Sequence, residues 1–200
     1  MKTIKIWNDS PSERQLDEIA DSLRDGDVVI IPTDTLYGVA CDALNPKAIE
    51  KICHLKGLNP EKAPLSVICS DISMAAEYAK IDDASYHLLR ANTPGPFTFI
   101  FRALSGLPKA FKNRKEVGIR IPDCATSRLI AERLGNPVMT TSIEYEDEDH
   151  AREPGLIAEA YADNVDLLVE GEEGMTEAST VVYCIGNDCE IRRQGRGELQ

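Results

Sequence analysis

Long apolar runs are absent from this sequence of 200 residues. No stretch approaches the roughly 20 apolar residues that a helix needs to cross a bilayer, and the first residues contain no apolar segment of the kind found in signal peptides. We therefore expect a soluble, cytoplasmic protein with no membrane partner. Tandem repeats, low-complexity tracts and obvious linkers are also lacking, and 42% hydrophobic residues suffice for one good-sized core. Residues 1–200 are predicted to form a single domain.

Paired cysteine motifs are also lacking. The six cysteines are spread singly, without a Cys-x-x-Cys pair and without clustered histidines, so the pattern favours neither a zinc site nor a disulfide framework. Buried, reduced thiols are the expected state. The positions concerned are Cys41, Cys53, Cys69, Cys124, Cys184 and Cys189.

Positive charge is scarce. The chain has 22 basic against 34 acidic residues and a net charge of −12, which disfavours a partner held by phosphate neutralisation over a wide surface. A local pocket for one small anionic ligand remains compatible with this balance. Basic residues concentrate at Lys109, Lys112, Arg114 and Lys115, at Arg120, and at Arg192, Arg193 and Arg196.

Several chemical signatures are missing as well. The sequence contains no glycine-rich phosphate loop of the Walker or dinucleotide type and no obvious Ser-His-Asp or Cys-His nucleophile set. The acidic run at residues 144–150 is more typical of a solvated loop than of a metal site. Such a loop could serve as a lid. His54 and His87 have no partner at ligand spacing. We therefore assign no catalytic nucleophile, no general base and no metal ligand.

Helix and strand patterns alternate along the chain. Ser10 and Glu13 form a capping-box pattern around Pro11, which predicts a helix that starts at Pro11, and Asn45-Pro46 predicts a second helix start. Some strands are separated by helices and others by short turns, so we expect an α/β fold with a mixed sheet. Predicted strands are 27–31, 65–69, 97–101, 117–121, 138–141, 165–169, 179–183 and 190–193; further helices are 84–91, 126–134 and 155–161.

Residues 31–38, which read IPTDTLYG, place many polar groups at the end of an apolar strand. Loops at strand ends of open α/β sheets commonly hold ligands, which favours a binding role. A turn capped by Asp34 and Thr35, with Gly38 at a positive φ, would also explain the segment taken alone.

Six further segments follow in order: Lys56 after a helix, PGPFT at 94–98, VGIRIP at 117–122, TTS at 140–142, STV at 179–181 and RQG at 193–195. Together with residues 31–38 they resemble the YrdC-like family over nearly the whole chain. Residues 92–95 (NTPG) and 141–142 (TS) are most similar to its YciO-like branch. The phenylalanines at 97, 99 and 101 alternate as one face of a strand does, and core packing is the favoured interpretation.

The resemblance implies a twisted open mixed sheet with flanking helices and a concave, basic cavity that holds ATP and L-threonine side by side. Arg120 can offer a guanidinium fork to a carboxylate or phosphate. Mg²⁺ is expected with ATP. The residues expected to bind threonine are Thr33, Thr35, Tyr37, Arg120 and Thr140; those expected to bind the nucleotide are Lys56, Ser142, Ser179 and Arg193.

The implied activity is that of an L-threonylcarbamoyladenylate synthase, which uses L-threonine, bicarbonate and ATP and serves transfer-RNA modification together with other proteins. Leu58 and Glu144 depart from the Lys-x-Arg and Ser-x-Asn elements of the synthase branch, which predicts weaker ATP binding or another ligand unless Lys62 compensates. Two alternatives stay open. One is an RNA-binding module for transfer RNA or double-stranded RNA, and the other is a nucleotide-dependent enzyme for another carbamoyl or amino-acid substrate.

Overall fold

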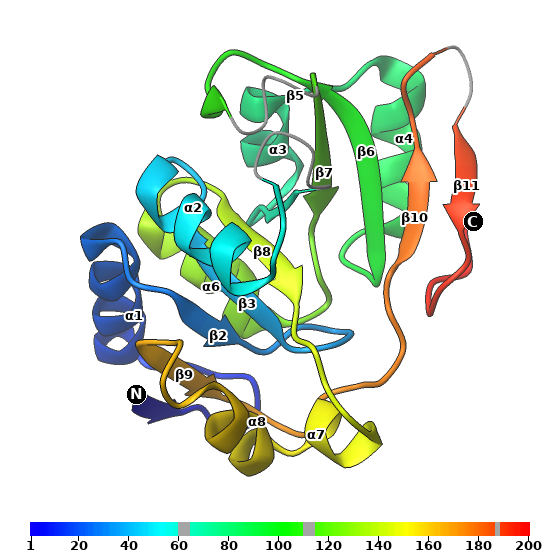
Figure 1. Cartoon of the computed structure of the whole chain (residues 1–200). Coiled ribbons are helices and arrows are strands. Elements are labelled where there is room, and N and C mark those ends of the chain that lie inside the picture. The colour runs from blue at the N-terminus through cyan, green and yellow to red at the C-terminus, as the bar shows by residue number, and fades with distance from the viewer. Residues whose placement is uncertain (60–64, 110–114, 187–188) are drawn as a thin grey trace.

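The computed structural model describes residues 1–59, 65–109, 115–186 and 189–200 (Figure 1). Lys62, Lys112 and Arg114, three cations noted in the sequence, lie outside the described residues. The strands are β1 Lys2–Lys5, β2 Val29–Ile31, β3 Gly38–Asp42, β4 Ser66–Ile68, β5 Ala79–Lys80, β6 Phe97–Ala103, β7 Glu116–Arg120, β8 Val138–Ser142, β9 Leu167–Glu170, β10 Thr180–Tyr183 and β11 Glu190–Arg193. The helices are α1 Glu13–Asp25, α2 Pro46–Leu55, α3 Ile72–Tyr78, α4 Asp83–Asn92, α6 Ala125–Leu134, α7 Glu148–Arg152 and α8 Pro154–Tyr161.

All these strands belong to one twisted, mixed sheet, as predicted. Its order is β1-β9-β2-β3-β8-β4-β7-β6-β10-β11, and β5 pairs with β6 away from this path. β1, β2, β4 and β10 each have a parallel neighbour, whereas β3 and β8 pair only antiparallel within the described sheet. The fold is therefore α/β with a mixed sheet (Figure 1).

Helices pack on both faces of the sheet and create two buried clusters. α1 and α6 pack together on one face, where Leu16, Ile19 and Leu134 enclose Ile68 and Val138. Helices α2, α3, α4 and α8 contribute to the cluster on the other face. One sheet can supply side chains to both clusters, because neighbouring residues along a strand point to opposite faces. Phe97, Phe99 and Phe101 belong to this second cluster and are at most 5% exposed, which confirms their assignment to the core.

The start of α1 differs from the prediction. Ser12, not Ser10, is the N-cap, and its capping-box partner is Gln15: the Ser12 amide donates to Gln15 Oε1 at 2.9 Å. Both serines fit the motif, but Gln15 Nε2 also donates to the Lys5 carbonyl at 2.8 Å. This link to β1 lies outside the local sequence pattern. At α2 the predicted Asn45 cap is confirmed.

The N-terminus of α6 is capped by a residue far away in sequence. Cys124 precedes the helix without a side-chain capping bond. Instead, the carboxylate of Asp9 accepts hydrogen bonds from the backbone amides of Ala125 and Thr126, the latter at 2.7 Å. Burial raises the pKa of Asp9, but the hydrogen bonds from Thr126 and Ala125 outweigh it and leave that pKa below its usual value.

We expect Asp9→Asn to lower the free energy of unfolding by about 1–2 kcal/mol at pH 7, because the charged cap is lost. A depressed carboxyl pKa contributes stability that is present above the unfolded pKa and is lost as the pH falls through the folded pKa. The difference between variant and wild type should therefore shrink from pH 7 to about pH 3 in urea unfolding. The exposed Asp163→Asn is the control; a difference that is independent of pH would contradict the capping charge.

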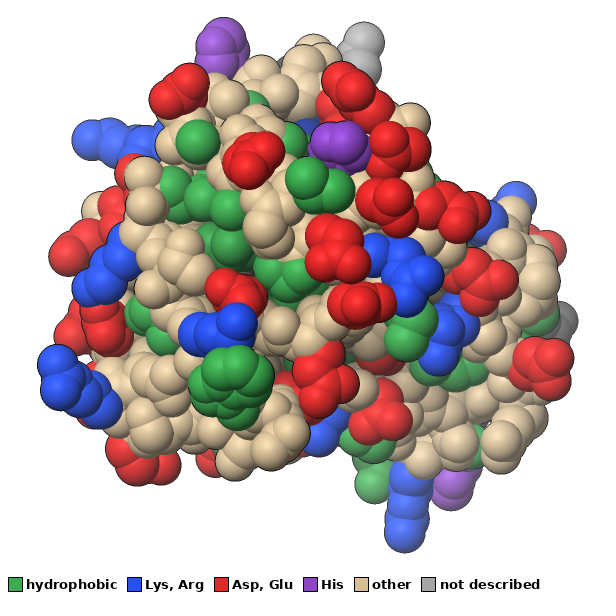
Figure 2. Space-filling model, turned by 90° about the horizontal axis from the view of Figure 1, so that it is seen from below, with side chains coloured by type: hydrophobic (Ala, Val, Ile, Leu, Met, Phe, Trp, Pro, Cys, Tyr) green, Lys and Arg blue, Asp and Glu red, His purple; other side chains and the backbone are tan. Residues whose placement is uncertain are grey.

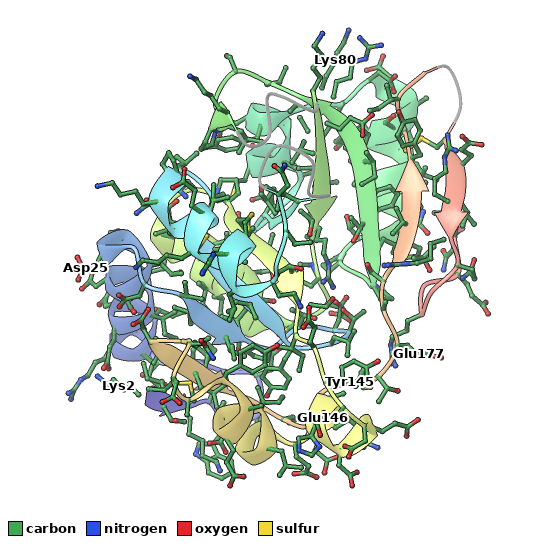
Figure 3. All side chains as sticks on the ribbon, viewed as in Figure 1. Lys2, Asp25, Lys80, Tyr145, Glu146 and Glu177 are labelled. Carbon is green, nitrogen blue, oxygen red and sulfur yellow. A yellow bond between two sulfur atoms is a disulfide. The ribbon has the colours of Figure 1, made fainter. Side chains whose placement is uncertain are left out.

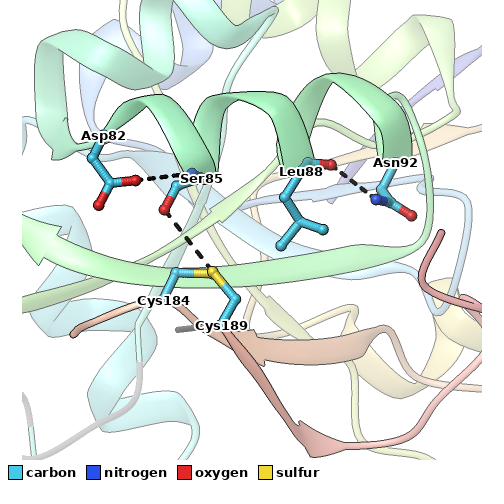
Figure 4. The surroundings of a disulfide bond; sticks show 6 residues. All are labelled: Asp82, Ser85, Leu88, Asn92, Cys184 and Cys189. Carbon is cyan, nitrogen blue, oxygen red and sulfur yellow. Dashed lines mark hydrogen bonds between the residues drawn. A yellow bond between two sulfur atoms is a disulfide. The ribbon is translucent and has the colours of Figure 1, made fainter. Parts of the chain in front are cut away.

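Two of the six thiols form a disulfide, which corrects the expectation of reduced cysteines throughout. Cys184 and Cys189 are joined at the end of the antiparallel β10–β11 pair, where their Cα atoms are 4.4 Å apart. Ser85 Oγ of α4 lies 3.9 Å from Cys189 Sγ (Figure 4). The hairpin brings the two cysteines together, and their spacing alone gave no sign of it. The other four are free and buried, as predicted, and burial raises the pKa of Cys124 to about 11.

The acidic segment at residues 144–150 is partly helical rather than a loop throughout. Residues 144–149 are exposed, as expected for a solvated segment, but α7 begins at Glu148, where Asp147 Oδ1 accepts from the His150 amide at 3.0 Å. Among the described residues, no group of three or more His, Cys, Asp or Glu side chains could hold a metal ion. No described helix combines the length and apolarity that a membrane span requires.

Candidate functional site

A cavity of about 280 Å³ lies on the sheet over β4, β6, β7, β8 and β10, and we call it the sheet-face cavity. Its floor is made of small residues in register: Ser66 pairs with Gly118 on one side and with Thr140 on the other. A Cβ atom at Gly118 would lie 2.9 Å from Ser66 Cβ and 3.0 Å from a methyl carbon of Thr98. Glycine at this position therefore keeps the floor open.

Strand alternation separates the cavity from the core. On β7, Gly118 and Arg120 line the cavity, whereas Ile119 between them belongs to the buried cluster beneath. On the cavity's own side of the sheet, Ile68 and Val138 mark the part that α1 and α6 cover. Apolar side chains thus occupy the helix-covered part, whereas the cavity is bordered by small and polar residues together with Leu65, Ile100, Val117 and Val181.

Arg120 anchors one end of the cavity. Its Nη2 atom donates to Asp34 Oδ1 at 2.8 Å and to Thr35 Oγ1 at 2.9 Å, and the side chains of Arg120 and Asp34 are each 7% exposed. Burial lowers the pKa of Arg120, while Asp34 acts in the opposite direction. The guanidinium is therefore a fixed, partly compensated cation.

A second cation reaches the same cavity from β11. Arg193 Nη2 donates to the backbone carbonyl of Ser179 at 2.8 Å, and the hydroxyls of Ser179 and Thr98 lie 2.8 Å apart. Ser179 precedes β10, which pairs with β6 on one side and with β11, the strand of Arg193, on the other. Two predicted nucleotide-binding residues are thus brought together by strand pairing.

Glu116 is a cavity residue that the sequence analysis missed. It lines the cavity at the start of β7, and Tyr183 donates its hydroxyl to Glu116 Oε1 at 3.0 Å. The period-two pattern of Glu116, Gly118 and Arg120 along one strand could have revealed it. The cavity therefore has a carboxylate near one end of β7 and a guanidinium at the other.

Two predicted threonine-binding residues line a different cavity. Thr33 and Tyr37 border a space of about 190 Å³ near Cys124, which we call the Tyr37 cavity. The Tyr37 hydroxyl donates to the Glu172 carbonyl at 2.7 Å and accepts from the Gly171 amide at 3.0 Å, and burial raises its pKa. Thr33 Oγ1 lies 3.1 Å from Thr35 Oγ1, so Thr33 is linked to Arg120 through Thr35.

Lys56 lies between the sheet-face cavity and a third space. Its ammonium donates to the carbonyl of Ser142 at 2.9 Å and forms an ion pair with Glu144 Oε1 at 2.8 Å. Ser142 borders the sheet-face cavity, while Lys56 and Glu144 line a space of about 650 Å³ under α8. Leu58 is partly buried and packs against the core.

Two buried polar atoms at the site have no hydrogen-bond partner within the described part of the chain: Arg120 Nε and Thr140 Oγ1. Thr140 is 3% exposed and its Oγ1 lies close to the backbone of Gly38. Unpaired buried polar atoms are costly for a folded protein. Both atoms belong to residues that line the cavity, where a water molecule or a polar ligand can complete the hydrogen bonding.

The structure thus groups Arg120, Thr140, Ser142, Ser179 and Arg193 around one cavity, with Thr35 touching Arg120. On the face of the molecule seen from below, basic side chains are interspersed with acidic ones (Figure 2). This pattern disfavours a broad nucleic-acid groove on that face. A small ligand in the sheet-face cavity fits the arrangement better.

Known proteins are similar to this chain in sequence and in fold. A 30% identical protein of Methanocaldococcus jannaschii, called "Putative threonylcarbamoyl-AMP synthase", matches over 184 residues, which are 90% of this chain and 86% of that one. The crystal structure of Escherichia coli YciO has a TM-score of 0.90 at 27% identity and covers 99% of this chain and 98% of its own. P. abyssi Sua5 complexed with L-threonine has a TM-score of 0.87 at 22% identity, over 98% of this chain and 58% of its own.

The Sua5/YciO/YrdC family model, described as "Telomere recombination", matches residues 21–195. That span includes every residue discussed above that borders the sheet-face cavity. The chain therefore belongs to the Sua5/YciO/YrdC family.

Proposed function

We propose that this protein is an L-threonylcarbamoyladenylate synthase of the Sua5/YciO/YrdC family, with its reactants in the sheet-face cavity. The observation that carries the proposal is the grouping of two guanidinium groups and several hydroxyls around one cavity with unpaired buried polar atoms. Support also comes from the relatives, since one carries the synthase name and P. abyssi Sua5 was crystallised with L-threonine.

The proposed reaction has two steps. The amine of threonine attacks the carbon of CO₂ derived from bicarbonate and loses a proton, which gives a carbamate. A carbamate oxygen then attacks the α-phosphorus of ATP, and the bond to the bridging oxygen breaks so that pyrophosphate leaves with the electron pair. Water, pyrophosphate and threonylcarbamoyl-adenylate are the products. Catalysis then depends on positioning and charge neutralisation, and no covalent enzyme intermediate is required.

The cavity residues divide the work by their chemistry. Arg120 is held rigidly by Asp34 and Thr35, so it is suited to the threonine carboxylate, which needs a fixed fork of donors. Thr140 has an unpaired hydroxyl and lines the same cavity. Arg193, Ser179 and Ser142 supply the donors for phosphate oxygens. In this proposal Thr33 and Tyr37 stabilise the loop that positions Thr35, because the Tyr37 hydroxyl is already hydrogen-bonded to the backbone.

Magnesium is proposed only as the ion that accompanies ATP. Glu116 is the one carboxylate among the described residues that line the sheet-face cavity, and no group of three metal-binding side chains occurs in the described ranges. These residues do not form a Mg²⁺ site of their own, so we assign no step to a protein-bound ion.

The test is a reaction with ATP, Mg²⁺, L-threonine and bicarbonate, followed by pyrophosphate release and by the mass of threonylcarbamoyl-adenylate. We expect pyrophosphate and the adenylate in equal amounts, and neither product when threonine or bicarbonate is omitted. Pyrophosphate that forms without threonine would point to another acceptor. No product, under conditions in which a synthase of the family turns over, would overturn the proposal.

A further inference from the structure

We infer that Glu144 sets the ligand preference of the proposed nucleotide site: by pairing with Lys56, it makes the site favour a nucleoside monophosphate over a triphosphate. The inference rests on the proposed function, because it concerns the same site. It adds a specificity residue and a ligand class, a phosphate ester of low charge. The negative charge of Glu144 then opposes the binding of ATP.

The cations around the site are largely compensated. Arg120 is 2.8 Å from Asp34 Oδ1, and Lys56 Nζ is 2.8 Å from Glu144 Oε1. Arg193 donates to a carbonyl oxygen, which is uncharged and does not neutralise the guanidinium. A monophosphate can be matched by Arg193 with neighbouring hydroxyls, whereas the additional phosphates of ATP require a further cation. Lys56 is the nearby candidate for that role.

Glu144 is well placed to keep Lys56 from a phosphate. The Lys56 side chain is 9% exposed and tied to the Ser142 carbonyl, so it has little freedom to move away. The backbone of Glu144 is held by α8, because its amide donates to the Tyr161 hydroxyl at 2.8 Å. The Glu144 side chain is 74% exposed. A phosphate that approaches Lys56 therefore meets a carboxylate held beside it, and the repulsion grows with the charge of the ligand.

Glu144→Gln isolates the charge, because glutamine has nearly the size of glutamate and can still accept a hydrogen bond from Lys56. Glu146→Gln is the matched control. Figure 3 shows Glu146 on the same segment between β8 and α7, and none of the described ion pairs joins it to Lys56. Both substitutions remove one negative charge, so a general effect of net charge appears in both variants.

The measurement is calorimetric titration of wild type and both variants with ATP and with AMP. We expect Glu144→Gln to tighten ATP binding by at least about tenfold and AMP binding by less than about threefold. Glu146→Gln should change both affinities by less than about threefold. The effect at Glu144 should decrease as salt is raised, because that side chain is exposed. Thermal unfolding confirms that the variants are folded.

The outcomes separate the inference from the proposed function. Equal effects of Glu144→Gln on ATP and AMP, or an effect no larger than that of Glu146→Gln, would overturn the inference and leave the nucleotide site standing. Failure of all three proteins to bind either nucleotide would overturn the proposed function and this inference with it. A selective gain for ATP in Glu144→Gln alone would establish Glu144 as the specificity residue.

Discussion

Asp34→Ala is expected to lower the free energy of unfolding by about 3–5 kcal/mol, because it leaves a buried guanidinium without its counter-charge. Arg120 Nη2 lies 2.8 Å from Asp34 Oδ1, and both side chains are 7% exposed. Asp34 Oδ2 also accepts from the Asp123 amide at 2.8 Å, so alanine removes a second partner. Urea unfolding at pH 7, extrapolated linearly to water, measures the loss.

An exposed ion pair provides the control for this substitution. Arg152 and Glu173 are 2.6 Å apart, but their side chains are 47% and 57% exposed. Water screens such a pair, so Glu173→Ala should cost less than about 1 kcal/mol. If both substitutions cost the same, the buried pair would not have the importance that its geometry implies.

A double variant distinguishes stability from function. Replacing Arg120 by Met in the Asp34→Ala background removes the unpaired charge and should restore part of the lost stability. Because the guanidinium is then absent, binding of threonine should not return with the stability. Recovery of both would mean that Arg120 serves packing alone. We therefore expect that the Arg120–Asp34 pair serves the binding site. The free-energy cost of burying these two charges is then offset by the burial of apolar side chains elsewhere in the fold.

Local pattern was sufficient for most strands but not for all elements. The predicted strand at 190–193 has the bounds of β11, and the helix at 126–134 differs from α6 by one residue. β3 was missed, because Gly38–Asp42 begins at the last residue of the polar segment 31–38 and its pairing with β8 is a long-range contact. Such pairing is set by tertiary structure, which propensity does not encode.

The sequence predicted which residues belong to the candidate site better than it predicted the contacts among them. Motif resemblance identified Arg120, Ser179 and Arg193, and these residues gather at one cavity. The motifs could not show that Tyr37 lies apart from these residues, with its hydroxyl hydrogen-bonded to the backbone of residues 171–172. Nor could they show that Glu144 contacts Lys56 across the end of β8. Side-chain partners far apart in sequence depend on the path of the chain, and a single sequence reveals that path only where patterns are strong.

Arg193→Gln should reduce kcat/KM for ATP by about a hundredfold, because it removes a charged donor for phosphate in a partly enclosed cavity. The guanidinium borders the sheet-face cavity and is oriented by the Ser179 carbonyl at 2.8 Å. Arg193 is otherwise exposed on an edge strand, so the substitution should change the free energy of unfolding by less than about 0.5 kcal/mol. Pyrophosphate release at varied ATP concentration measures the loss.

Arg192→Gln is the matched control, because it removes the same charge from the neighbouring position of β11. Its guanidinium pairs with Glu190 at 2.5 Å and stacks on the Tyr183 ring at 4.7 Å, and it is not among the described residues that line the cavity. We expect its kcat/KM to stay within about threefold of wild type. A similar loss in both variants would mean that β11 contributes only a general field. A loss confined to Arg193→Gln would place a phosphate at the Ser179 end of the cavity, opposite the threonine proposed at Arg120.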